Sequence, residues 1–214
     1  MIVPFPKHFA GVLLAVGCAV SAVAQSTNNS PAPMPRRPSI IFILADDLGY
    51  GDIGCYGQDR IKTPNLDRLA AEGIRFTSCY AGSTVCSPAR AALMLGQHTG
   101  HLRIRGNARA TSLSSDEVTV ARLLQESGYR TALLGKWGLA EEGSPGVPQR
   151  VGFDEFMGYL SNTEAHNYYP DFVWRYDPAR PGHGGFDGKM GYPENGGAKQ
   201  SVYVPDLCTT AALN

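Results

Sequence analysis

Two adjacent carboxylates, Asp46 and Asp47, directly follow the residue after an uninterrupted apolar run at residues 39–44. Their oxygens are hard donors, so the pair suits Ca²⁺ or Mg²⁺ better than a soft metal. Acidic residues in a turn or at a helix cap would give the same dipeptide. The carboxyl end of a buried strand, however, is where open α/β sheets place their ligands. The position therefore favours a divalent-cation site.

A second reactive group is Cys86, in the pentapeptide Cys-Ser-Pro-Ala-Arg that ends at Arg90. Continuation of the sequence to Gly96 gives the spacing C-x-P-x-R-x4-L-G. The ordinary alternative is a small buried thiol at the start of a helix, with Pro88 in the first turn and Arg90 exposed. The complete spacing instead resembles the signature of the sulfatase family, in which this cysteine is oxidised to formylglycine.

The resemblance implies a nucleophile that is made from Cys86 after translation. In the family, the formylglycine aldehyde is hydrated, one hydroxyl attacks sulfur, and the second hydroxyl then expels sulfate. An ordinary serine or cysteine would be left as a stable covalent sulfate, so the modified residue builds release into nucleophilic catalysis. The resemblance also implies that Asp46, Asp47 and the modified Cys86 bind a cation, usually Ca²⁺ and alternatively Mg²⁺. Arg90 would hold the charged diol.

Lys136 ends an apolar segment and is similar to the family lysine that contacts the sulfate. A snorkelling lysine at the end of a strand is the alternative. The second family signature usually has a histidine two residues further on, where this chain has Gly138. We expect His166, in the loop 162–170, to supply the missing proton-transfer group, because the ordinary pKa of imidazole suits that role. A surface-loop histidine is the competing interpretation.

The predicted site is incomplete in its metal ligands. The family adds an Asp followed by Asn, Gln or His, with a further Lys and His, and no convincing counterpart follows Lys136. Two aspartates and a formylglycine cannot supply the six to eight oxygens that calcium prefers. We therefore expect weak calcium binding and little hydrolysis from these 214 residues alone. Further candidates for lining a substrate pocket are His98, His101, Arg105 and Asn107.

Alternating elements must position these groups. The apolar, β-branched run at residues 39–44 predicts a parallel strand that is buried on both faces. Capping and turn residues predict the ends of the helices. The expected elements are a helix from Pro64 to Gly73 with Thr63 as N-cap, a strand at 74–80, a helix at 117–127 and a strand at 129–134.

This alternation predicts an α/β fold, doubly wound, with a mostly parallel sheet and helices on both faces. The resemblance narrows it to the alkaline-phosphatase-like fold, truncated at the carboxyl side. Residues 39–214 would form the amino-terminal portion of a sulfatase catalytic domain. The chain after residue 141 is expected to be rich in loops, because Gly, Pro and Tyr clusters dominate it.

The first 24 residues have the pattern of an export signal, with an apolar run and a small-x-small cleavage site before Gln25. Lipid attachment at Cys18 is a weaker alternative. Residues 25–38 would form a flexible leader. Both interpretations predict an exported protein, periplasmic or extracellular, with membrane contact only if Cys18 is lipidated.

Composition limits the partners. The chain has 19 basic and 19 acidic residues, which gives no reason to expect nucleic acid. The cysteines predict no disulfide framework and no zinc ribbon. Expected partners are a sulfated small molecule or glycan, and a formylglycine-generating or sulfatase-maturating enzyme. Alternative functions are a phosphodiesterase or phosphonate hydrolase of the same superfamily, and a non-catalytic exported anion-binding remnant.

Overall fold

The computed structural model describes residues 37–108, 110–178 and 188–214. The predicted export signal at 1–24, Cys18 and nearly all of the leader lie outside the described residues. The chain divides into two units, 1–44 and 45–214, and each is described by itself. Within residues 37–44 of the first unit there is no regular secondary structure, and every residue is exposed.

The predicted strand at residues 39–44 is therefore wrong. Ile41 and Ile43 are 86% and 80% exposed, and no strand among the described residues pairs with this run. Its composition suits a buried strand, but a strand forms only where a neighbour accepts its backbone hydrogen bonds. The strand predicted at 74–80 is absent for the same reason, with Ile74 and Tyr80 83% and 87% exposed.

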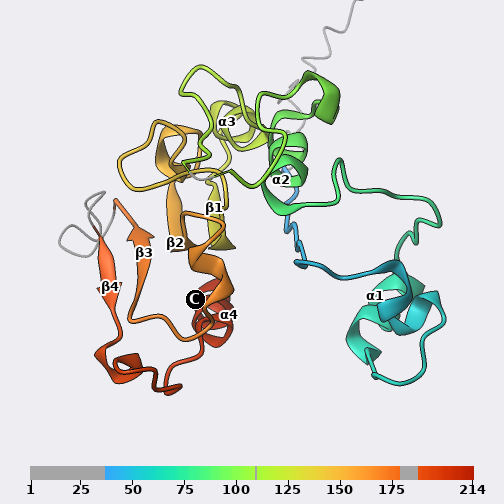
Figure 1. Cartoon of the computed structure of the whole chain (residues 1–214). Helices are drawn as coiled ribbons and strands as arrows, with labels where there is room; N and C mark the ends of the chain where they lie inside the picture. Colours follow the sequence, from blue (N-terminus) through green and yellow to red (C-terminus); the bar gives the residue numbers. More distant parts are fainter. Residues whose placement is uncertain (1–36, 109, 179–187) are drawn as a thin grey trace, which may run out of the picture. The chain divides into compact units, whose positions relative to one another are not determined.

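The second unit is built on one four-stranded sheet in the order β1-β2-β3-β4 (Figure 1). Strands β1 and β2 are parallel, and the other two pairs are antiparallel. The register sets Lys136 at the end of β1 opposite Tyr159 at the end of β2. The strands are β1 (Ala132–Lys136), β2 (Glu155–Tyr159), β3 (Phe172–Tyr176) and β4 (Lys189–Gly191).

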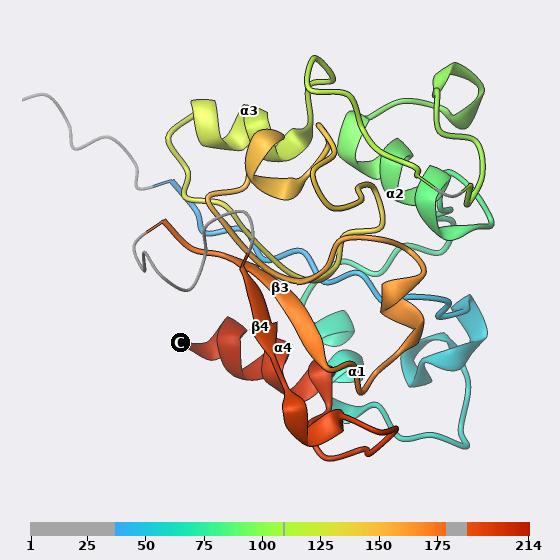
Figure 2. The same cartoon turned by 60° about the vertical axis from the view of Figure 1, so that its left-hand side comes forward.

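Helices cover both faces of this sheet, which confirms the α/β class, although the described sheet is mixed (Figures 1 and 2). Phe156 and Trp174 point into a core shared with α2 and α3, whereas Met157 and Val173 point into a second core against α4. This alternation follows from the two-residue period of a strand. The helices are α1 (Pro64–Glu72), α2 (Cys86–Leu95), α3 (Val120–Glu126) and α4 (Val204–Leu213).

Most predicted element boundaries shift by a few residues. Helix α1 begins and ends as expected, but the Thr63 hydroxyl does not cap it. That hydroxyl accepts a hydrogen bond from the Gly54 amide and donates one to Asp67. Helix α3 is shorter than expected, and Thr119 caps it by accepting from the Arg122 amide. The segment after residue 141, expected to be loops, contains three of the four strands and α4.

Two glycines bring β1 and β2 close together just before the end of β1. Gly158 has φ 150°, and a Cβ on it would collide with the carbonyl of Gly135, its register partner. The ladder continues beyond the strands, since the amides of Trp137 and Gly138 donate to Tyr159 and Leu160 at 2.9 and 3.0 Å. The backbone on both sides of Lys136 is therefore fixed to β2.

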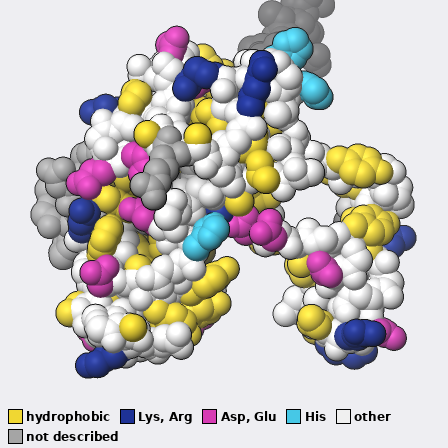
Figure 3. Space-filling model, viewed as in Figure 1, with side chains coloured by type: hydrophobic (Ala, Val, Ile, Leu, Met, Phe, Trp, Pro, Cys, Tyr) yellow, Lys and Arg dark blue, Asp and Glu magenta, His cyan; other side chains and the backbone are white. Residues whose placement is uncertain are grey.

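The described residues form no membrane-spanning helix, and the face seen in Figure 3 carries charges of both signs. None of the helices within residues 37–108, 110–178 and 188–214 is long and apolar enough to cross a bilayer. On the face that Figure 3 presents, acidic and basic side chains are interspersed, with hydrophobic side chains between them.

Candidate active site

The amino end of α2 carries the predicted nucleophile position. Cys86 is the first residue of the helix and is half-buried, and Ser87 behind it is fully buried. The Ser87 amide donates to the side-chain oxygen of Asn107 at 2.9 Å. Pro88 suits the first turn because the helix needs no amide donor there. Position 86 is thus a partly accessible side chain on a fixed helix end.

Arg90 lies one helical turn after Cys86 and joins α2 to the end of β1. Its guanidinium donates to the carbonyl of Lys136 at 2.6 Å and lies 3.8 Å from one carboxylate oxygen of Asp46. Its side chain is 12% exposed. Burial is the largest effect and lowers the pKa of Arg90 below its ordinary value. The charges of Asp46 and then Cys86 act in the opposite direction. The guanidinium stays charged, since arginine is not deprotonated in proteins.

Lys136 closes the cluster from β1. Its ammonium nitrogen is 2.8 Å from the second carboxylate oxygen of Asp46, and its side chain is 9% exposed. Burial acts to raise the pKa of Asp46. The hydrogen bond and charge of Lys136, followed by Arg90 and His166, more than offset it, so the pKa lies below its ordinary value. Two cations and one carboxylate from three separate segments therefore meet beside the start of α2.

Asp47 is not drawn into this cluster by any hydrogen bond or ion pair that the structure records. Its backbone is left-handed, with φ 56°, which aspartate tolerates better than most residues. Among the described residues, no group of three or more His, Cys, Asp or Glu side chains could hold a metal ion. Both oxygens of Asp46 already face cations. These residues by themselves do not fit a calcium ion, which takes six to eight oxygens.

The structure also brings His166 within electrostatic range of Asp46, although 120 positions separate them in the chain. His166 ends the short 3-10 helix η5 (Glu164–His166) and is exposed. Glu164 fixes this turn, because one carboxylate oxygen accepts from the amides of Leu160 and Ser161, each at 3.0 Å. The other accepts from the Trp174 indole at 3.0 Å.

Sequence reasoning missed Glu164, although a signal was present. Residues 161–164 read Ser-x-x-Glu, the capping-box pattern. The box forms here, since the Glu164 amide donates to the Ser161 hydroxyl at 3.1 Å while Glu164 accepts from the Ser161 amide. A capped turn directly before His166 predicts an ordered histidine rather than a loose one.

Of the four further candidates, only Asn107 contacts the Cys86 segment, through the Ser87 amide. The His98 ring accepts from the Gly100 amide, and the Arg105 guanidinium donates to the carbonyls of Leu102 and Gly100. His98, His101 and Arg105 are exposed, and their recorded hydrogen bonds stabilise their own turn.

The sulfatase family model matches residues 38–202. The chain belongs to the sulfatase family. It is 42% identical to mouse steryl-sulfatase over 163 residues, which are 69% of this chain and 26% of that protein. It is 41% identical to the N-acetylglucosamine-6-O-sulfatase of Bacteroides thetaiotaomicron over 180 residues, which are 84% of this chain and 27% of the relative. The chain thus spans about a quarter of the length of these curated relatives.

Solved structures agree with this assignment. The structure of Ps i-CgsB in complex with k-i-k-neocarrahexaose matches with a TM-score of 0.60 and 32% identity. The match covers 79% of this chain and 39% of that one. A sulfatase fold therefore underlies the sheet and helices that hold Cys86, Arg90 and Lys136.

Gly138 stands where the sulfatase signature has a histidine. Its backbone conformation and its distance from Arg90 would both be unfavourable for a histidine side chain. It has φ 71°, a left-handed conformation that side chains rarely adopt. A Cβ there would lie 3.2 Å from the Cδ of Arg90. The glycine therefore lets the buried Arg90 side chain pass close to the backbone after β1.

Proposed function

We propose that this protein hydrolyses sulfate esters, with a formylglycine made from Cys86 as the nucleophile. The supporting observation is the meeting of Arg90 and Lys136 beside the first residue of α2, with both cations directed at one carboxylate. Cationic donors fixed in advance, at partly buried positions, stabilise the negative charge that develops on sulfuryl oxygens. Family membership supplies the reaction class.

Each residue has a role in this proposal. The hydrated aldehyde supplies one hydroxyl that attacks sulfur and a second that allows sulfate to leave. Arg90 and Lys136 bind the sulfuryl oxygens and hold the ester in line with position 86. His166 gives a proton to the departing alcohol oxygen, which is the role left open by Gly138. Asp46 keeps the two cations in place until the ester arrives.

The proposal includes a divalent cation, Ca²⁺ or alternatively Mg²⁺, for which Asp46, Asp47 and the modified Cys86 would supply oxygens. Its remaining ligands are not among the groups described above, so no step is assigned to it. The substrate would be an aryl or carbohydrate sulfate ester, and the enzyme that modifies Cys86 would be a further partner. We also propose that the protein is exported, on the strength of the signal pattern in residues 1–24.

The test begins with the Cys86 peptide. The chain is expressed with a formylglycine-generating enzyme, and mass spectrometry should show this peptide lighter than its unmodified form. The converted protein should then release nitrophenol from nitrophenyl sulfate, slowly, and faster than from a nitrophenyl phosphate diester. Cys86→Ala should abolish this release, while Cys79→Ala, at an exposed cysteine outside the site, should not.

Two results would contradict the proposal. Unmodified Cys86 in the native host would favour a non-catalytic anion-binding protein. Preference for the phosphate diester would favour the phosphodiesterase alternative.

A further inference from the structure

The amino end of α2 lacks a capping side chain of its own. Val85 precedes the helix, and no side-chain hydrogen bond caps it from there, since valine has no acceptor. The first amides of an α-helix have no partner inside the helix, and Pro88 has no amide to donate. Two donors are therefore left at this end, those of Cys86 and Ser87. They belong to the proposed nucleophile and to the residue directly behind it.

Asn107 supplies the missing cap from another segment of the chain. Its side-chain oxygen accepts from the Ser87 amide at 2.9 Å, although 20 positions separate the two residues. Ser87 is fully buried, so the loss of Asn107 would leave this amide both buried and unpaired. A buried donor without an acceptor carries the full cost of its desolvation. Asn107 therefore affects the geometry of the turn that carries Cys86.

The segment that carries Asn107 is anchored in the same core as α2. Leu102 and Ile104 are 2% and 6% exposed, and they belong to one buried cluster with Ala91 of α2. The Arg105 guanidinium donates to the Leu102 carbonyl at 2.9 Å, which fixes the backbone between these two residues. Asn107 thus holds the end of the helix against a fixed support rather than against a loose loop.

The first turn of α2 is held on two sides. Arg90 joins it to β1 through the Lys136 carbonyl at 2.6 Å, and Asn107 joins it to the segment 102–107 through the Ser87 amide at 2.9 Å. A turn that is held at one point can rotate about that point, whereas a second hydrogen bond to another segment removes this freedom. The two bonds together therefore determine where the side chain at position 86 points.

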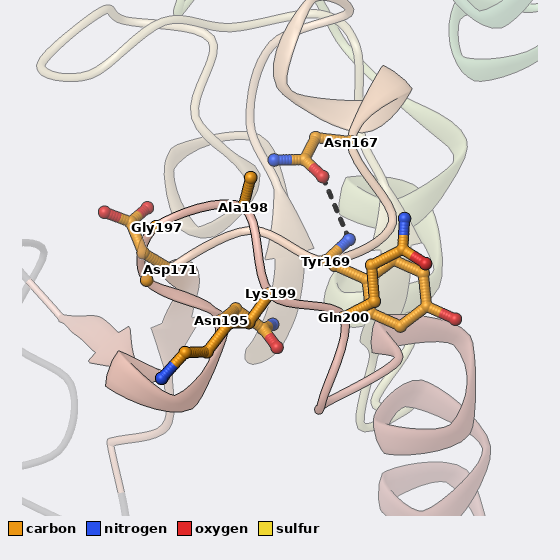
Figure 4. Close-up of a pocket in the computed structure, with 9 residues that line it drawn as sticks. Asn167, Tyr169, Asp171, Asn195, Gly197, Ala198, Lys199 and Gln200 are labelled. Carbon is orange, nitrogen blue, oxygen red and sulfur yellow. Dashed lines mark hydrogen bonds between the residues drawn. The ribbon is translucent and has the colours of Figure 1, made fainter.

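The sequence predicts Asn107 as a lining residue of a substrate pocket, whereas the structure gives it a different place. The cavity of about 370 Å³ in Figure 4 is lined by residues from the segments 167–171 and 195–200. Asn107 is not among its lining residues, and the recorded hydrogen bond of its side chain goes to the backbone of α2. This arrangement suits a role exercised through the helix rather than through contact with a substrate.

We infer that Asn107 is a positioning residue, which caps α2 from outside the helix and so fixes the direction of the side chain at position 86. Its role in catalysis rests on the proposed function, whereas the cap itself does not. Misplacement of a reacting group by about 1 Å can cost about a hundredfold in rate. Loss of the cap should therefore lower kcat, while KM stays nearly the same because Arg90 and Lys136 still bind the ester.

Kinetics of the formylglycine-bearing 214-residue chain with nitrophenyl sulfate test the catalytic role. Rates are expressed per converted chain, from the mass of the Cys86 peptide. Asn107→Ala should lower kcat about tenfold or more and change KM less than about twofold. Asn107→Asp should restore kcat to within about twofold, because a carboxylate accepts the same hydrogen bond and suits the amino end of a helix. The added charge would weaken binding of an anionic ester, an effect confined to KM.

Hydrogen exchange at the Ser87 amide, followed by NMR in the unconverted chain, tests the cap without any reaction. Asn107→Ala should speed this exchange about tenfold or more, whereas Asn107→Asp should keep it slow. Asn107 is exposed, so its truncation removes no buried side chain, and thermal unfolding checks that each variant is folded. Asn65→Ala and Asn65→Asp, at an exposed asparagine in the first turn of α1, are the matched controls and should change neither exchange nor kcat.

Two results would overturn the inference. One is unchanged exchange at Ser87 in Asn107→Ala. The other is a loss of kcat that Asn107→Asp does not restore, since Asn107 would then act through its amide nitrogen. Failure of the two proposals is distinguishable. If the unchanged protein cleaves no sulfate ester but Asn107→Ala speeds exchange, only the hydrolytic function is wrong. If the ester is cleaved and kcat is the same in Asn107→Ala, only the positioning role is wrong.

Discussion

Asp46 accepts a hydrogen bond from Lys136 and forms a longer ion pair with Arg90, and this difference explains how the site is held ready. The Lys136 ammonium takes one oxygen at 2.8 Å, while Arg90 approaches the other at 3.8 Å and keeps a stronger bond to the Lys136 carbonyl. The hydrogen bond to the Lys136 carbonyl thus positions Arg90 more than Asp46 does. The guanidinium can therefore contact a bound anion while it keeps this hydrogen bond. When a sulfate ester binds, the Lys136 ammonium would exchange its ion pair with Asp46 for one with the ester.

His166 is the residue whose role a single substitution tests most directly. In the formylglycine-bearing protein, His166→Gln should lower the turnover of an alkyl sulfate ester about a hundredfold or more, because the alkoxide then leaves without a proton donor. Release of inorganic sulfate, followed by ion chromatography, measures this. Gln97→Ala, at an exposed glutamine to which no role in the site is assigned, is the control and should leave turnover unchanged. A decrease of less than about threefold in the His166 variant would refute the assignment.

Site residues that lie within a single sequence motif could be predicted, whereas contacts between residues far apart in the sequence could not. Cys86 and Arg90 share one turn of a helix, and Lys136 ends a strand, so each lies within one short segment whose resemblance to a sulfatase signature predicted its role. The pairing of Asp46 with Lys136 joins residues 90 positions apart and needs the fold. The proximity of His166 to Asp46 likewise depends on where η5 is anchored, which Glu164 decides.

At the scale of elements, Asp154 ties α3 to the start of β1 and β2. One carboxylate oxygen accepts from the Thr131 amide at 2.8 Å, and the other accepts from the Gln125 amide group at 2.6 Å. Burial acts to raise the pKa of Asp154, but these bonds, the backbone one first, lower it below the ordinary 3.8. The folded state therefore favours the charged form.

The sign of the resulting pH dependence follows from this lowered pKa. Stability from Asp154 is fully present above pH 3.8 and is lost as the pH falls through the lower folded value. Asp154→Asn should cost about 1 kcal/mol of unfolding free energy at pH 7. Urea unfolding from pH 7 to pH 2.5 should show this difference shrinking below pH 4. The control is Asp59→Asn, at an exposed carboxylate. A difference that persists unchanged at pH 2.5 would contradict the prediction.

The elements themselves were predicted unevenly, for a physical reason. Helix ends carry local signals, and α1 and α3 were predicted from Pro, Gly and capping residues. Strands carry no such signal, because pairing decides them. The apolar run at 39–44 has the composition but no partner among the described strands, whereas β2, which contains Gly158, forms because β1 and β3 lie on either side.

At the scale of the whole molecule, the part of the chain that the structure describes leaves apolar surface exposed. Residues 39–44 are exposed throughout, and β1 pairs on one edge only among the described residues. A six-residue window with high β-propensity, no charge and no proline is the typical signature of an aggregation-prone segment. The sheet edge at β1 adds unpaired backbone groups. Both features predict self-association of these 214 residues.

Placing charge in the exposed run should reduce this association without affecting the fold. Ile41→Lys with Ile43→Lys removes no buried contact, since both side chains are at least 80% exposed. Light scattering against concentration should show aggregation begin at a concentration several-fold higher, while the thermal unfolding temperature stays the same. Gln97→Lys with Ser115→Lys adds the same charge at exposed polar positions outside the apolar runs and controls for net charge. Equal effects of the two pairs would mean that charge alone acts, and that the apolar run is not the segment through which the chains associate.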